Sequence, residues 1–302
     1  MTKTVSLLTC LKGREDYITR YLYLSSAFDY KHKILILKEQ GSTHFKIPED
    51  LDVSVIETDT QIYGMSDIFK VLNRHKSTIL QFKYCHYVED DNFIFTESLD
   101  RLVDFLESSC EFSAAVGNAF LHDNKTFSFL NSYRLPSIKA QTSEERLLEF
   151  NGGLTYYSLF KTEEFTKICN IVSHISDNNM SEISFNISAV VKIRVKYLNV
   201  LFLAREYPRP KIYNIPSSLA WLTDQKFSYE LRNLVEILVK ELKLDMSDQD
   251  FFNIALADYF SSRFSPKEKL VREIIYNFYS KSILKNSKEV KEYLELLKSF
   301  NK

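Results

Sequence analysis

The sequence of 302 residues is poor in glycine and proline, with six of each. Collagen-like repeats and long flexible linkers require many of these residues, so both architectures are excluded. The four cysteines include no Cys-x-x-Cys pair, and neither the cysteines nor the histidines show a spacing typical of a zinc site. We therefore expect buried, reduced thiols and a cytoplasmic protein.

The sequence has no excess of either charge and no long hydrophobic run. The 39 Lys and Arg residues face 40 Asp and Glu residues, so the net charge is -1. Nucleic acid is not an expected partner, because binding to phosphates requires a basic surplus. The most apolar stretch, residues 195–204, is shorter than the roughly 20 residues that span a bilayer. Residues 5–11 are apolar but lead directly into charged residues, so we interpret them as a buried strand and not as a signal peptide.

Apolar residues make up 45% of the sequence, and their spacing predicts the fold class. Helical periodicity alternates with short β-branched runs, which lie at residues 4–10, 33–37, 53–56, 84–88 and 112–120. This alternation predicts an α/β fold with a mostly parallel sheet flanked by helices. Beyond Pro216 only helical periods occur, so we predict an α/β domain over residues 1–214 and an all-helical domain over residues 215–302.

Local patterns predict further elements. Thr96 is expected to cap a helix, and Thr142 with Glu145 forms the pattern of a capping box at the start of another. A strand is expected over residues 154–160, and two of the C-terminal helices are expected over residues 248–260 and 266–284.

Three consecutive carboxylates, Glu89, Asp90 and Asp91, directly follow the predicted strand at residues 84–88. Ligands of open α/β sheets bind at the carboxyl ends of the strands. Adjacent carboxylates repel one another, and a Mg²⁺ or Mn²⁺ ion that bridges them to phosphate oxygens relieves the repulsion. The segment therefore predicts a diphosphate and metal site, and a solvated acidic turn is the structural alternative.

Three segments resemble the GT-A-type glycosyltransferases. Residues 4–9 with Arg14–Ile18 are similar to the family's first strand and helix start, residues 34–43 are similar to its second strand and following turn, and Glu89–Asp91 lies where its D-x-D motif follows the fourth strand. Residues 143–163 and 181–207 are similar to a bacterial family 2-like branch associated with surface polysaccharide synthesis.

This resemblance, over residues 4–207, implies an enzyme that moves a sugar from a nucleotide-activated donor to an acceptor hydroxyl. It further implies inversion at the sugar, a divalent cation (Mn²⁺ or Mg²⁺), and a role in capsule, O-antigen or related glycan biosynthesis. Glu39 and Glu89 stand where the family usually has aspartate. The longer side chains leave the donor and the metal dependence open.

The resemblance also implies roles for single residues. Thr9 and Glu39 would contact the base and ribose, and Asp90 or Glu89 would contact the ribose. Asp91 would hold the metal ion, with Glu89 as a second ligand.

The phosphates and the reaction need further groups. Arg14 and Lys70 are candidates for phosphate contact, with solvated surface charge as the alternative, and Arg205 is a candidate for binding the leaving diphosphate. A general base must take the proton from the acceptor hydroxyl. We expect this base to be Glu182, with Asp177 as the alternative, although either residue could instead act only in helix capping or dipole compensation.

The expected partners are a nucleotide-diphosphate sugar and a glycan or lipid-linked glycan acceptor. Contact with the inner face of the cytoplasmic membrane and homo-oligomerisation through the C-terminal helices are left open, as is packing of these helices on the catalytic domain. Two other functions compete. A sugar nucleotidyltransferase would need a glycine-rich basic loop after the first strand, where the chain has only Lys12-Gly13-Arg14. A non-catalytic GT-A-like binding or scaffold protein would keep the sheet without turnover.

Overall fold

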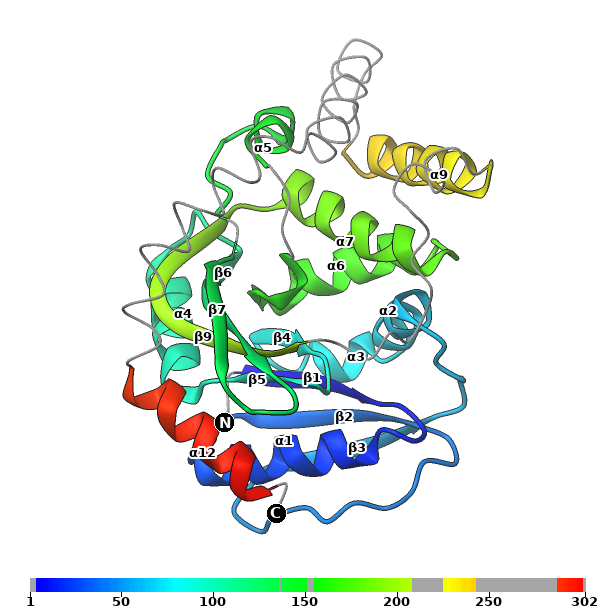
Figure 1. The fold of residues 1–302 in the computed structure, drawn as a ribbon. Coiled ribbons are helices and arrows are strands. Elements are labelled where there is room, and N and C mark those ends of the chain that lie inside the picture. Colours follow the sequence, from blue (N-terminus) through cyan, green and yellow to red (C-terminus); the bar gives the residue numbers. More distant parts are fainter. Residues whose placement is uncertain (1–3, 136, 151–154, 208–224, 243–286, 301–302) are drawn as a thin grey trace.

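The computed structural model describes residues 4–135, 137–150, 155–207, 225–242 and 287–300. Its centre is a mixed nine-stranded sheet of order β3-β2-β1-β4-β8-β6-β9-β5, with β7 paired to β6 (Figure 1). The strands are β1 (Thr4–Cys10), β2 (Lys33–Glu39), β3 (Val53–Thr58), β4 (Tyr84–Val88), β5 (Asn92–Ile94), β6 (Ala114–Asp123), β7 (Phe129–Arg134), β8 (Leu159–Lys161) and β9 (Val195–Tyr207). The predicted α/β class is confirmed.

The first four strands form a parallel half-sheet. β1 pairs in parallel with β2 and β4, and β2 pairs in parallel with β3. All seven residues of β1 and all five of β4 are buried, as their continuous apolar sequences require for strands covered on both faces. Parallel pairing places the carboxyl ends of these strands at one edge of the sheet. Thr9 lies near the end of β1, Glu39 ends β2 and Glu89 directly follows β4.

The second half of the sheet is mixed. β6 runs parallel to β9, whereas β8, β5 and β7 pair antiparallel with their neighbours. The β6–β9 ladder shifts register on both sides of Asn118, beside Gly117. A Cβ atom on Gly117 would lie 2.6 Å from the carbonyl oxygen of Val200, so only glycine allows this approach.

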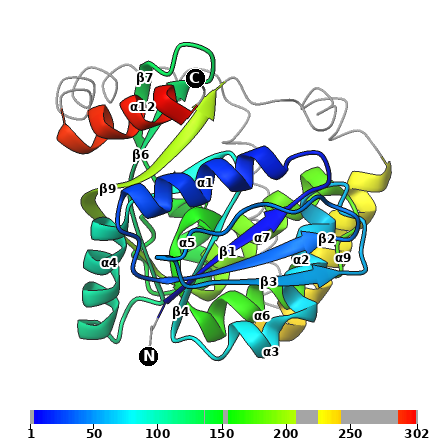
Figure 2. The same cartoon turned by 90° about the horizontal axis from the view of Figure 1, so that it is seen from below.

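The helices cover both faces of the sheet (Figures 1 and 2). α2, α6 and α7 pack together on one face, and α1 lies on the other with α12 against it. Their bounds are α1 (Glu15–Ala27), α2 (Met65–Arg74), α3 (Lys76–Ile79), α4 (Thr96–Ser108), α5 (Ser143–Glu149), α6 (Thr162–Val172), α7 (Asn178–Lys192), α9 (Gln225–Leu242) and α12 (Lys288–Phe300).

Several local predictions need correction. A strand was expected over residues 154–160, but Thr155–Tyr157 is a 3₁₀ turn, η1, and only Leu159–Lys161 forms a strand. Thr96 was expected to cap α4, yet it is the first helical residue and Phe95 precedes it without a side-chain cap. The capping box of Thr142 and Glu145 at α5 is confirmed.

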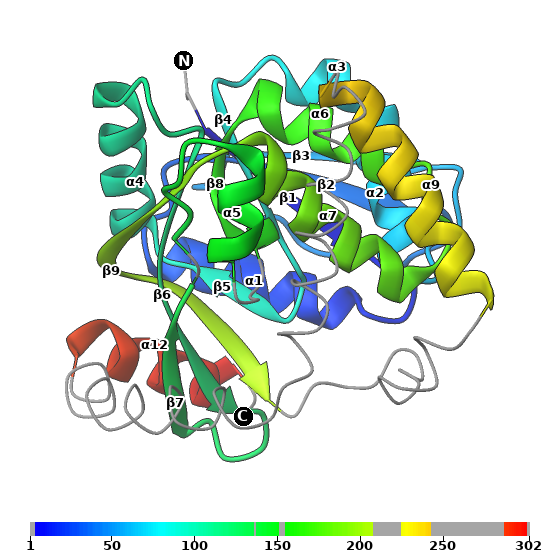
Figure 3. The same ribbon diagram turned by 90° about the horizontal axis from the view of Figure 1, so that it is seen from above.

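The two described helices of the C-terminal segment pack on the α/β part at separate places (Figure 3). α9 contacts α6 and α7 and buries Leu234 and Leu238, and α12 contacts α1 and buries Tyr293 and Leu297. The predicted boundary at residues 214/215, and the helices expected at 248–260 and 266–284, lie outside the described residues. The division into two domains therefore stays a prediction.

Two further expectations concern the thiols and the membrane. Cys10, Cys85 and Cys169 are free and buried, as expected, whereas Cys110 is free but exposed. Within the described ranges, no helix has the length and hydrophobicity needed to cross a bilayer.

Candidate functional site

The acidic segment lies where β4 ends and β5 begins, and Arg14 pairs with two of its three carboxylates. Asp90 accepts two hydrogen bonds from Arg14, from Nε at 2.7 Å and from Nη2 at 2.6 Å. Both side chains are largely buried, at 13% exposure for Arg14 and 7% for Asp90. Burial raises the pKa of Asp90 and the Arg14 pair opposes this rise, which leaves a neutralised pair across the turn.

The turn after β1 presents Arg14 to this carboxylate. Gly13 has φ +81°, a conformation that side chains disfavour, and Arg14 N donates to the Leu11 carbonyl at 3.0 Å. The Arg14 guanidinium also stacks 4.2 Å from the centroid of Tyr17. Arg14, expected at a phosphate, is thus held mainly by Asp90.

Glu89 contacts η1 through Tyr157. Its Oε2 accepts a hydrogen bond from Asn92 Nδ2 at 3.0 Å and a second one from the Tyr157 hydroxyl. Asn92 Nδ2 also donates to the Tyr157 hydroxyl at 3.2 Å. Neither Asn92 nor Tyr157 was expected from the sequence, because their contacts to Glu89 depend on how β4, β5 and η1 come together.

Asp91 is 5% exposed and its Oδ2 lies 3.8 Å from Arg14 Nη2. Its donor atoms are carboxylate oxygens, which suit a hard divalent cation that keeps other ligands from phosphate or water. In the part of the chain that the structure describes, no group of three or more His, Cys, Asp or Glu side chains could hold a metal ion by itself. A cation at this position would therefore have at most two of these carboxylates as ligands and would need its other ligands from phosphate or water.

The carboxyl ends of β1 and β2 contribute the expected base and ribose residues. Thr9 is buried, with its hydroxyl 3.2 Å from the Tyr87 hydroxyl. Glu39 Oε2 accepts a hydrogen bond from the backbone N–H of Lys12 at 3.0 Å, which joins the turn after β1 to the end of β2. Both residues lie at the same edge as the acidic segment because β2, β1 and β4 are adjacent and parallel.

Arg205 reaches the acidic segment from β9. It pairs with Asn92 in the β5–β9 ladder, and its guanidinium lies 4.8 Å from the centroid of Tyr157. It also donates a hydrogen bond to the hydroxyl of Tyr133 on β7. The prediction placed Arg205 at a strand end, and the structure brings it to Glu89 through Tyr157.

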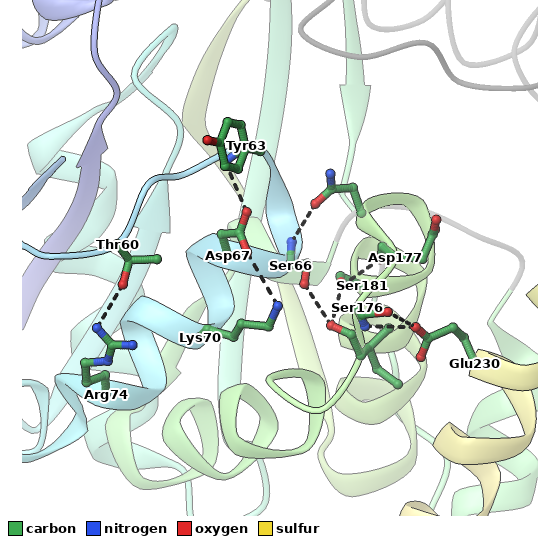
Figure 4. Close-up of polar contacts among 12 residues, drawn as sticks. Thr60, Tyr63, Ser66, Asp67, Lys70, Arg74, Ser176, Asp177, Ser181 and Glu230 are labelled. Atoms are coloured by element: carbon green, nitrogen blue, oxygen red, sulfur yellow. Dashed lines mark hydrogen bonds and ion pairs between the residues drawn. The ribbon is translucent and has the colours of Figure 1, made fainter. Parts of the chain in front are cut away.

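Lys70 lies on α2, where it pairs with Asp67 one turn earlier at 3.4 Å (Figure 4). Asp67 also accepts a hydrogen bond from the backbone N–H of Tyr63 at 3.1 Å. This pairing matches the alternative of a surface charge.

Glu182 and Asp177 both belong to the start of α7. Asp177 is the N-cap: Oδ1 accepts a hydrogen bond from Met180 N at 2.8 Å, and Oδ2 lies 3.6 Å from Lys226 Nζ. The same end of α7 touches the start of α2, where Ser66 donates to the Ile175 carbonyl at 2.8 Å (Figure 4). Because α2 follows β3, this contact brings the start of α7 toward the carboxyl edge of the sheet.

Glu182 lies one turn before Asn186 on α7, so both are on the same helix face. Asn186 Oδ1 accepts hydrogen bonds from Thr155 N at 2.7 Å and from Thr155 Oγ1 at 2.8 Å. Thr155 precedes Tyr157 in η1, and Tyr157 contacts Glu89. The α7 face that includes Glu182 is therefore directed toward η1, which adjoins the acidic segment.

The sequence and the structure were compared with known proteins. No protein-family model matches the sequence, and no curated protein is significantly similar to it. Among solved structures, the chain resembles S. aureus TarS. One TarS crystal structure aligns over 100% of this chain and 53% of its own, with 13% identity and a TM-score of 0.51.

A second TarS crystal structure, of residues 1–349, aligns over 100% of this chain and 91% of its own, with 14% identity and a TM-score of 0.48. At this level of identity the TarS likeness concerns the fold, and the function has to be argued from the site.

Proposed function

We propose that this protein is a glycosyltransferase that moves a sugar from a nucleotide-diphosphate donor to an acceptor hydroxyl. The observation that supports this most strongly is the convergence of Asp90, Asp91 and Glu89 with Arg14 and Arg205 at the carboxyl edge of a parallel half-sheet. Ligands of such sheets bind at this edge. This edge belongs to a sheet whose overall fold resembles that of S. aureus TarS.

Different residues of the chain would bind different parts of the donor. We assign Thr9 and Glu39, near the ends of β1 and β2, to the base and ribose, and Arg205 to the leaving diphosphate. Arg14 lies closer to Asp90, at 2.6 Å, than to Asp91, at 3.8 Å. We therefore assign Asp91 to a divalent cation, with Glu89 as the second candidate. A Mn²⁺ or Mg²⁺ ion bound there would offset the negative charge of the diphosphate.

Transfer also needs a base for the acceptor hydroxyl, and we assign Glu182 to this role. The Asp177 carboxylate already caps α7 and pairs with Lys226, whereas Glu182 lies on the α7 face directed toward η1. An ionised carboxylate within hydrogen-bond reach of the hydroxyl takes its proton as the oxygen attacks the sugar. Attack opposite the leaving diphosphate inverts the anomeric centre without a covalent enzyme intermediate.

We further propose a cell-surface glycan as acceptor, such as a capsule, an O-antigen or a lipid-linked precursor. This proposal about the acceptor rests on the resemblance of the sequence to a bacterial branch associated with surface polysaccharide synthesis.

A ligand panel tests the proposed function. Thermal shift and calorimetry are measured with UDP, GDP, CDP and CMP, each with and without Mn²⁺, on wild type, Asp91→Ala and the exposed control Asp104→Ala. We expect one nucleoside diphosphate to bind wild type and Asp104→Ala in a Mn²⁺-dependent manner, and Asp91→Ala to lose this dependence. Binding of none of these nucleotides would contradict the proposal and favour a non-catalytic module.

A further inference from the structure

Four side chains from three distant segments form one contiguous cluster beside the acidic segment, namely Glu89, Asn92, Tyr157 and Arg205. Glu89 Oε2 accepts from both Asn92 and Tyr157, and the Tyr157 ring lies 4.8 Å from the Arg205 guanidinium. Asn92 and Arg205 are also direct partners in the β5–β9 ladder. Glu89 and Arg205 therefore contact opposite parts of the same tyrosine, its hydroxyl and its ring.

The Tyr157 ring is held firmly between these two groups. The side chain is fully buried, at 0% exposure, and packs against Tyr156 with the rings tilted and 4.3 Å between their centroids. Two residues earlier, Thr155 is anchored to Asn186 of α7 through both its backbone N–H and its hydroxyl. A buried ring with a fixed backbone and a fixed hydroxyl has a single orientation, and so determines where a stacked guanidinium lies.

We propose that Tyr157, fixed by Glu89, is a positioning residue that orients Arg205 toward the diphosphate of the donor. This inference rests on the proposed function. A guanidinium is planar, and two of its N–H groups bind one phosphate together only when the plane faces that phosphate. The Tyr157 ring and the Tyr133 hydroxyl both contact the guanidinium, and together they restrict the orientation of this plane.

The same arrangement gives a reason for glutamate at position 89. The longer side chain of Glu89 extends from the end of β4 to the hydroxyl of Tyr157 and to Asn92, which lies three residues further along the chain. Besides its candidate role as a second metal ligand, Glu89 then also acts on the diphosphate through Tyr157 and Arg205. The departure from the aspartate of the D-x-D motif is thus part of the site.

A double-mutant cycle in the full chain tests this inference. Calorimetry with the tightest-binding nucleoside diphosphate of UDP, GDP and CDP, in the presence of Mn²⁺, compares wild type, Tyr157→Phe, Arg205→Gln and the double variant. The corresponding nucleoside without phosphates is measured in parallel. Tyr197→Phe serves as the control, because it removes a hydroxyl whose partners, Asn118 and Asn199, lie elsewhere on β6 and β9.

Tyr157→Phe keeps the ring and removes the hydroxyl, so we expect diphosphate affinity to fall about fivefold, the size of one hydrogen bond, with nucleoside affinity unchanged. In the Arg205→Gln background the same change should have no further effect. Tyr133→Phe, which removes the other Arg205 contact, should also weaken the diphosphate selectively.

The inference is overturned if Tyr157→Phe leaves affinity unchanged, or if it weakens binding equally with and without Arg205, while wild type still binds in an Asp91-dependent manner. If wild type binds no nucleoside diphosphate, the proposed function fails and the inference fails with it.

Discussion

At the scale of single residues, the choice of base can be tested by two isosteric substitutions on one helix. We expect Glu182→Gln to lower turnover at least about 100-fold with donor binding unchanged, because a general base contributes about 10²–10⁴ in rate. Asp177→Asn keeps an acceptable N-cap for α7, so turnover should stay within about threefold of wild type. Initial rates with a nucleotide sugar and a glycan acceptor measure both variants.

The opposite pattern, with Asp177→Asn inactive and Glu182→Gln active, would move the base to the cap position. Melting temperatures of both variants serve as the control for folding, since neither substitution changes side-chain size.

At the scale of elements, the Arg14–Asp90 pair joins the turn after β1 to the end of β4. Arg14→Gln leaves a buried carboxylate without its counter-charge, and we expect a loss of about 3 kcal/mol in the free energy of unfolding. The double variant Arg14→Gln/Asp90→Asn should lose less than the sum of the single variants. Urea unfolding at pH 7 provides these values.

An exposed arginine pair offers a matched control. Arg74 pairs with Asp59 at 52% and 83% side-chain exposure, so Arg74→Gln should cost at most about 1 kcal/mol. Strictly additive losses for Arg14 and Asp90 would show that the two groups do not stabilise one another.

Helices and strands could be predicted from the sequence where a local pattern of residues is enough to determine them. The buried apolar runs of β1 and β4 and the capping box of Thr142 and Glu145 were identified correctly. The three-residue strand β5 was not predicted, because it forms only through pairing with β9, more than 100 residues away in the sequence. The strand expected at residues 154–160 became partly a 3₁₀ turn, where Thr155 bonds to Asn186 of α7.

The same reasoning applies to the site. The acidic segment Glu89–Asp91 could be proposed from the sequence because it follows a predicted strand of a parallel sheet. Glu39 and Arg205 could be proposed only through the family resemblance. Tyr157 could not, since no spacing in the sequence relates it to Glu89. The pairing of Arg14 with Asp90 was equally hidden, because it depends on the conformation of the turn at Gly13.

At the scale of the whole molecule, two buried histidines make stability depend on pH. Burial and the charge of His32 lower the pKa of His86 to about 3, and burial and Arg20 lower that of His122 to about 4. In an unfolded chain the value is about 6.5. Between these values the unfolded chain binds protons that the folded chain does not. The stability that each neutral histidine contributes is therefore complete above about pH 6.5, and it is lost as the pH falls toward 4 for His122 and toward 3 for His86.

We expect each of these histidines to cost about 2 kcal/mol of stability between pH 7 and pH 5. His122→Gln should lose less stability over this range than wild type, by about that amount, in urea unfolding at the two pH values. An equal loss in both proteins would mean that His122 is not kept neutral in the folded state.

Helix α12 packs into the hydrophobic core of the α/β part of the protein. Tyr293 is buried against the rings of Phe93, Phe95 and Phe120, and its hydroxyl lies 3.2 Å from His122 Nε2. Phe93 lies only two residues after Asp91, so the end of the chain supports the strand that follows the acidic segment. This helix is therefore joined to the structure around the candidate site.

The most direct test of the central claim is to locate the cation itself. Crystals grown with Mn²⁺ and the nucleoside diphosphate that binds best would give an anomalous manganese signal. The account predicts a peak within coordination distance of an Asp91 carboxylate oxygen, with the diphosphate on the same ion and near Arg205. A well-ordered nucleotide bound away from the carboxyl edge of β1, β2 and β4, or manganese at other residues, would contradict it.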